Sequence, residues 1–273
     1  MSGEQAVTTG NEVRVNGVSL HFEEHGVGEP IVCVHGTGSS AALWAHSAPE
    51  LARRGRTILY DRRGFGRSER PEPFVTDVHV QTDDLAGLID ALGAAPAIVI
   101  GRSHGGEIAV DLALRYPDRV RALALLEGGA LSLGEEFGRW YAGLHERLLA
   151  AAEADVDSVA ETFLRDVLGA AGWEGMPEHV KEVFVANGPA IVAEERGGLL
   201  DVTVEQLGTI TKPTLLVAGR GSPPAFAEVT NLMARAMPAA RVAWVEGGHL
   251  IDPAHPAVLG FVDEVLAVEP ARR

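Results

Sequence analysis

The sequence predicts an α/β protein whose mostly parallel sheet is covered by helices on both faces. Short apolar runs, typical of buried strands, alternate with segments of helical periodicity through most of the chain. One such run, 97–100, leads directly into Gly101-Arg102-Ser103-His104-Gly105 and then into a helical pattern. A Gly-x-Ser-x-Gly turn between a strand and a helix is typical of a nucleophile elbow, in which the serine stands on a strained turn.

The composition is that of a globular protein with an excess of acidic residues. The chain has 273 residues, of which 46% are hydrophobic, and a formal net charge of -15. This charge argues against a broad surface for nucleic acid or anionic membranes, so we expect neither as a partner. The single cysteine, Cys33, excludes an intramolecular disulfide. Without a basic and apolar leader or an apolar stretch of membrane-spanning length, the sequence predicts a cytoplasmic protein.

The first half of the chain supplies six predicted strands. Alternating residues around Asn16-Gly17 predict an antiparallel hairpin over 13–22, because this dipeptide favours a tight two-residue turn. Continuous apolar runs predict strands that are buried on both faces. Such strands are expected over 31–34, 57–60 and 97–100, a further strand is expected over 120–126, and helices are expected over 41–54, 77–92 and 104–116.

The alternation of strands and helices is interrupted over 131–209, which shows helical spacing only. An apolar stripe on one predicted helix face contains Phe137, Trp140, Tyr141, Leu144 and Leu148. The alternation then resumes with strands over 214–218 and 241–245 and helices over 225–236 and 256–268. The sequence therefore predicts eight strands, a core domain formed by 1–130 and 210–273, and a helical domain over 131–209.

Three motifs, in a fixed order along the chain, carry a resemblance to a known superfamily. His35-Gly36 follows the third predicted strand, the Ser103 motif follows the fifth, and Gly247-Gly248-His249 follows the last. In these motifs and their order the chain resembles the α/β-hydrolase superfamily nearly from end to end. The resemblance implies that 131–209 is the cap, which in this superfamily roofs the active site.

The resemblance also suggests the partners of Ser103. A serine hydroxyl needs a base to become a nucleophile, and the superfamily places this base where His249 stands. A tetrahedral oxyanion needs preorganised N–H donors. We expect these to be the amides of His104 and Thr37, with Gly36 as the alternative to Thr37. The ring of His104 is expected to point away from the site, and His35 to fix its loop through hydrogen bonds.

The acid of the triad departs from the common pattern. Relatives carry an aspartate after the strand that follows the cap, but here 218–222 reads Ala-Gly-Arg-Gly-Ser. Glu127 ends the strand after the elbow helix, and its extra methylene would let it reach His249 from there. Lactonases of the fungal zearalenone hydrolase type, which the chain resembles in this respect, combine a serine nucleophile with a glutamate at this position. Asp252 is the alternative acid, and the charged loop 61–68 is expected to be structural.

A serine at the elbow excludes the mechanisms of haloalkane dehalogenases and epoxide hydrolases, which need a carboxylate nucleophile. The sequence predicts a serine hydrolase that cleaves a small, hydrophobic carboxylic ester or lactone through an acyl-enzyme. Carbon-carbon bond hydrolysis, cofactor-free peroxidation and a non-catalytic small-molecule receptor remain as alternatives. Trp140, Tyr141 and Trp173 of the cap are candidate substrate contacts. No cofactor is expected, and no metal, since no residue cluster has ligand spacing; the oligomeric state is left open, a homodimer included.

Overall fold

The computed structural model describes residues 7–9 and 11–268, and these form a nine-stranded sheet in the order β1-β2-β3-β5-β4-β6-β7-β8-β9. The eight predicted strands are present, and the short β1 adds a ninth at the edge. Strands β4 to β9 run parallel, whereas β1, β2 and β3 pair antiparallel. The strands are β1 (Val7–Thr9), β2 (Glu12–Val15), β3 (Val18–His25), β4 (Pro30–Val34), β5 (Arg56–Tyr60), β6 (Ala97–Arg102), β7 (Val120–Leu126), β8 (Thr214–Gly219) and β9 (Ala240–Val245).

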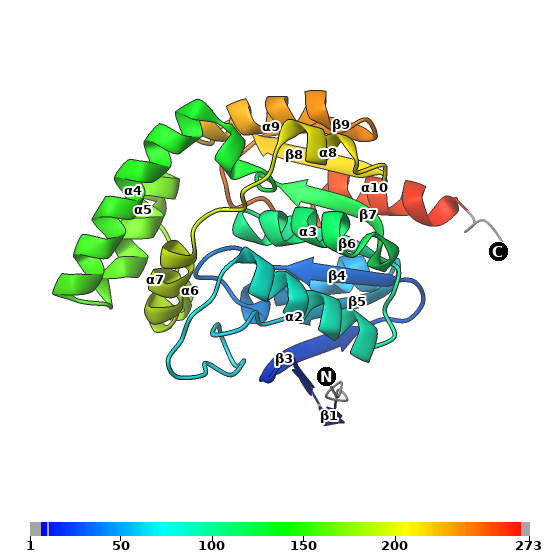
Figure 1. Cartoon of the computed structure of the whole chain (residues 1–273), viewed down its shortest axis with the longest axis horizontal. Helices are drawn as coiled ribbons and strands as arrows, with labels where there is room; N and C mark the ends of the chain where they lie inside the picture. The colour runs from blue at the N-terminus through cyan, green and yellow to red at the C-terminus, as the bar shows by residue number, and fades with distance from the viewer. Residues whose placement is uncertain (1–6, 10, 269–273) are drawn as a thin grey trace.

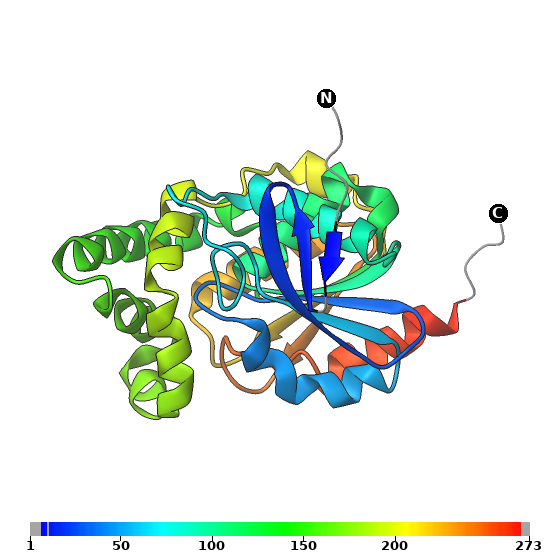
Figure 2. The same cartoon turned by 90° about the horizontal axis from the view of Figure 1, so that it is seen from below.

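Helices cover both faces of this sheet, as predicted (Figures 1 and 2). Side chains alternate along the central strand β6: Val99 belongs to one apolar core, and Ile98 and Ile100 to the other. The first core is closed by α2 (Val78–Ala91), α3 (His104–Arg115) and α9 (Pro224–Ala236). The second is closed by the 3-10 helix η1 (Ala41–Ser47), α1 (Ala48–Ala52) and α10 (Pro256–Ala267). A short 3-10 turn, η2 (Pro117–Arg119), precedes β7.

The segment between β7 and β8 contains helices as its only regular secondary structure. It contains η3 (Leu131–Leu133), α4 (Glu135–Ala154), α5 (Ser158–Glu174), α6 (Glu178–Ala186), α7 (Gly188–Gly197) and α8 (Val204–Gly208). Helices α4 to α7 share an apolar cluster and lie beyond the carboxyl ends of the parallel strands (Figure 1). Helix α8 instead packs against α9, and Leu207 joins the core of the sheet. We refer to α4–α7 as the helical layer.

No helix in the described part of the chain combines the length and the apolar composition that a membrane span requires.

Candidate active site

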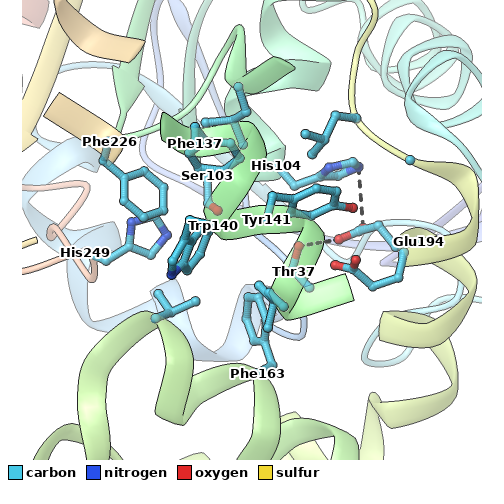
Figure 3. Close-up of a pocket in the computed structure, with 16 residues that line it drawn as sticks. Thr37, Ser103, His104, Phe137, Trp140, Tyr141, Phe163, Glu194, Phe226 and His249 are labelled. Atoms are coloured by element: carbon cyan, nitrogen blue, oxygen red, sulfur yellow. Dashed lines mark hydrogen bonds and ion pairs between the residues drawn. The ribbon is translucent and has the colours of Figure 1, made fainter. Parts of the chain in front are cut away.

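Ser103 stands on a sharp turn between β6 and α3. Its backbone angles, φ 55° and ψ -127°, are ones that residues with a side chain rarely adopt. Backbone crowding explains the glycines of the motif: a Cβ atom at Gly101 would lie 2.4 Å from the carbonyl oxygen of Gly105, and one at Gly105 would lie 2.2 Å from that of Val34. The turn therefore has the geometry that the sequence motif predicts, and it projects the Ser103 side chain into a pocket (Figure 3).

The side chains of Glu127 and His249 form a buried hydrogen-bonded pair. Nδ1 of His249 lies 2.8 Å from Oε2 of Glu127, and the two residues are only 4% and 3% exposed. The Glu127 carboxylate also accepts hydrogen bonds from the amide of Gly219 (2.5 Å) and the hydroxyl of Ser222 (2.7 Å). A left-handed backbone at Glu127, with φ 46°, turns the chain at the end of β7. The structure thus brings together the predicted base and the predicted acid.

The alternative acid, Asp252, lies elsewhere. Its carboxylate accepts a hydrogen bond from the hydroxyl of Ser47 at 2.6 Å and lies 3.7 Å from Nε2 of His46. The side chain is 46% exposed and makes no hydrogen bond or ion pair with His249. Three residues after His249 the side chain of Asp252 contacts the end of η1 instead of the histidine, so this alternative is not supported.

The predicted oxyanion donors lie beside the elbow. Thr37 follows β4, and a Cβ atom at the preceding Gly36 would lie only 3.1 Å from Cβ of Ser103, so this loop runs directly against the nucleophile. His104 is the first residue of α3, where the amides point out of the helix and favour negative charge. The amides of Thr37 and His104 have no hydrogen-bond acceptor among the described residues. Both are therefore available to a ligand.

His35 fixes this loop, as expected. Its Nε2 accepts a hydrogen bond from the amide of Arg62 at 3.0 Å, and its Nδ1 lies 2.9 Å from the carbonyl oxygen of Gly36. Burial, and then the charge of Arg62, hold the pKa of His35 well below its ordinary value. A neutral ring suits this bridging role, which engages both of its nitrogens.

The pocket in front of Ser103 is lined by apolar side chains of the helical layer and a polar wall. Two of the three candidate substrate contacts, Trp140 and Tyr141, line this pocket, whereas the third, Trp173, does not. Trp173 instead packs against α6, with Nζ of Lys181 5.1 Å from its ring. A residue that the sequence did not single out, Phe226 at the start of α9, has its ring centroid 4.4 Å from that of His249. The other lining residues are Thr37, Ser103, His104, Leu131, Phe137, Leu144, Phe163, Val167, Glu194, Glu195, Gly198, Leu199 and His249 (Figure 3).

The polar wall comes mainly from α7. Glu194, 3% exposed, pairs with Arg62 at 2.6 Å, accepts a hydrogen bond from the hydroxyl of Thr37, and lies 3.6 Å from Nε2 of His104. Burial alone would raise the pKa of Glu194, but the charges of Arg62 and His104 outweigh it and lower this pKa to about 2. Burial raises the pKa of the neighbouring Glu195, which interacts with Tyr141.

The structure corrects the prediction that the ring of His104 points away from the site. The ring is buried in the pocket wall, with Nδ1 2.9 Å from Oε2 of Glu107 and Nε2 facing Glu194 (Figure 3). A carboxylate three residues along the same helix holds the ring there, an i,i+3 spacing that is visible in the sequence. Glu194, by contrast, is 91 positions further along the chain than Ser103, and no sequence pattern indicates that it belongs to the site.

No group of three or more His, Cys, Asp or Glu side chains within the described residues is arranged to hold a metal ion.

Comparison with known proteins places this geometry in a family. The family model described as alpha/beta hydrolase fold matches residues 29–252. Over 256 residues the chain is 32% identical to the Azorhizobium caulinodans protein named "Putative carbamate hydrolase RutD", covering 90% of this chain and 96% of that one. A thermophilic esterase from Thermogutta terrifontis superposes with a TM-score of 0.76 at 26% identity, over 97% of this chain and 98% of that chain. The enol-lactonase from Burkholderia xenovorans LB400 gives 0.74 at 25% identity, over 94% and 100%. The chain therefore belongs to the alpha/beta hydrolase family.

Proposed function

We propose that this protein is a serine hydrolase that cleaves a carboxylic ester or lactone through an acyl-enzyme intermediate. One observation carries the proposal: the strained serine shares its pocket with a histidine whose other ring nitrogen is hydrogen-bonded to a buried carboxylate. This arrangement activates a hydroxyl, because the carboxylate selects the ring tautomer and stabilises the imidazolium that forms.

In the proposed mechanism, His249 removes the proton from Ser103 as its oxygen attacks the carbonyl carbon. The amides of Thr37 and His104 stabilise the resulting oxyanion. The tetrahedral intermediate collapses when His249 donates the proton to the leaving oxygen, which leaves an acyl group on Ser103. His249 then takes a proton from water, whose oxygen attacks the acyl carbon, and returns the proton to Ser103 as the acid is released. The Glu127 carboxylate balances the charge of the imidazolium.

The substrate class is supported by the pocket and by the relatives. Side chains of the helical layer, Phe137, Leu144, Phe163 and Val167, present apolar surface to the nucleophile. This surface suits a small hydrophobic acyl or alkyl group, and we propose that α4–α7 act as the cap that selects it. Esters and lactones are the substrates named for the two similar structures, the esterase and the enol-lactonase.

A fluorophosphonate probe tests the nucleophile directly. We expect covalent labelling that maps to Ser103 and is lost in Ser103→Ala. Turnover of p-nitrophenyl esters of graded chain length, beside a set of lactones, then identifies the substrate class. Saturable ligand binding without labelling would instead indicate a receptor. Labelling without ester or lactone turnover, but with cleavage of a vinylogous diketone, would indicate a carbon-carbon bond hydrolase.

A further inference from the structure

A single buried carboxylate contacts both residues whose amides are proposed to bind the oxyanion. Glu194 accepts a hydrogen bond from the hydroxyl of Thr37 through Oε1, and its Oε2 lies 3.6 Å from Nε2 of His104. Figure 3 shows this carboxylate between the two side chains, with a dashed line to each. Thr37 and His104 belong to different elements, the loop after β4 and the start of α3, and Glu194 belongs to the helical layer. No other carboxylate in the described residues contacts both.

Arg62 balances the negative charge of the buried Glu194 carboxylate. Nη1 of Arg62 is 2.6 Å from Oε2 of Glu194, the amide of Gln81 donates to the same oxygen at 3.3 Å, and Arg62 is 1% exposed. An unpaired carboxylate here would repel a developing oxyanion and would be costly to bury. Because the guanidinium compensates it, the carboxylate can hold neighbouring groups in place without opposing the negative charge of the transition state.

A second residue of the same region of the chain holds the same loop. Nδ2 of Asn187, which precedes α7, donates to the carbonyl oxygens of Gly38 at 2.9 Å and Ser39 at 3.1 Å. Asn187 is 2% exposed and carries no charge. The loop after β4 is therefore attached to the helical layer at two points, through its backbone by Asn187 and through the Thr37 hydroxyl by Glu194.

We infer that Glu194 is a positioning residue for the two oxyanion donors: it holds Thr37 by its hydroxyl, and its charge lies 3.6 Å from Nε2 of His104, whose ring Glu107 holds at Nδ1. The inference rests on the proposed function. Oxyanion donors act only when they are held within a fraction of an ångström of the productive geometry, and such precision comes from side chains that are themselves locked by neighbours. A group of this kind should affect the chemical step and tetrahedral-analogue binding, with little effect on the binding of substrate in its ground state.

The experiment uses Thr37→Val, Glu194→Gln and the double variant. Thr37→Val replaces the hydroxyl with a methyl group and leaves both Arg62 and Glu194 in place, so it tests the contact even if Glu194 variants are poorly folded. Glu194→Gln keeps an acceptor of the same shape but removes the charge. Glu195→Gln is the matched comparison, because Glu195 lines the same wall but contacts Tyr141 and His145 rather than the oxyanion residues. The readouts are the rate constant for phosphonylation of Ser103, kcat and KM for the best ester, and circular dichroism.

We expect each of the two single changes to lower the phosphonylation rate and kcat about tenfold, less than the loss caused by deleting a donor outright, with KM changed by less than about threefold. The double variant should lose less than the product of the two single losses, because both changes weaken the contact between Thr37 and Glu194. Glu195→Gln should slow phosphonylation much less. Glu194→Gln should restore part of the rate lost in Glu194→Ala.

Two results would overturn the inference while leaving the proposed function intact. The first is labelling of Thr37→Val at the wild-type rate, and the second is a double variant whose loss is the product of the two single losses. If wild-type protein is not labelled at Ser103 at all, the proposed function fails and the inference falls with it. The two failures are therefore distinguishable.

Discussion

Nδ1 of His249 lies 2.8 Å from Oε2 of Glu127, although the two residues follow strands that are not neighbours in the sheet. Glu127 follows β7, His249 follows β9, and the intervening strand β8 ends at Gly219, whose amide donates to the same carboxylate. The side chain of Glu127 therefore reaches across the end of β8 to the ring of His249. The aspartate that is common in this superfamily follows β8, the strand next to β9, and would therefore start closer to the ring of His249.

This relationship predicts that Glu127→Ala lowers kcat by about 10³ to 10⁴-fold with little loss of folded structure, since the imidazole loses the group that selects its tautomer. Steady-state kinetics measures kcat, and circular dichroism measures the folded structure. Asp252→Asn is the control, because Asp252 bonds to Ser47 and not to the histidine, and it should cost far less. Near-normal kcat in Glu127→Ala would show that the acid has been misassigned.

The neighbouring Ser222 allows a sharper test. Its hydroxyl donates to Oε2 of Glu127, the oxygen that also faces the ring of His249, so it stands close to where relatives carry aspartate. We predict that adding Ser222→Asp to Glu127→Ala restores part of the lost kcat. Recovery should be incomplete, because Pro223 and Pro224 restrict the loop. A double variant as slow as Glu127→Ala would mean that the acid must approach from β7.

Ser103 provides a prediction about stability. Its φ of 55° strains any residue with a Cβ atom, and glycine relieves this strain while losing some backbone entropy. Both Ser103→Ala and Ser103→Gly should lose nearly all hydrolytic activity. Ser103→Gly should be more stable than Ser103→Ala by about 1 kcal/mol in urea unfolding. Equal stability of the two variants would argue that the turn is not strained.

The buried Glu194 predicts how stability depends on pH. The pKa of its carboxyl falls from 4.5 to about 2 in the folded protein, because Arg62 and His104 outweigh the effect of burial. A lowered carboxyl pKa adds stability above pH 4.5 that is lost as the pH falls toward 2. Between about pH 6 and about pH 3, the free energy of unfolding of the wild type should therefore fall by about 2 kcal/mol more than that of Glu194→Gln. Urea midpoints across this range measure the difference, and parallel curves would contradict it.

The sequence by itself determined the parallel sheet and the position of its elbow, because these depend on local patterns. Apolar runs predict buried strands wherever they occur, and Gly101 and Gly105 reflect a backbone approach between near neighbours. It also indicated Glu127, because a carboxylate at a parallel strand end lies at the edge where the other motifs meet. Because no aspartate stands after β8, the acid of the triad had to come from another position, and this favoured Glu127.

Only the tertiary structure decided how the helical layer meets this edge. Trp140 and Trp173 are both aromatic residues in amphipathic helices, yet one lines the pocket and the other packs against α6. Helical periodicity tells which face of a helix is apolar but not which neighbour covers it. Glu194 likewise looks like an ordinary surface glutamate in the sequence. It becomes a buried partner of Thr37 and Arg62 only because the packing of α7 brings it against residues that are distant in the sequence. Arg62 and Glu194, for example, are 132 positions apart.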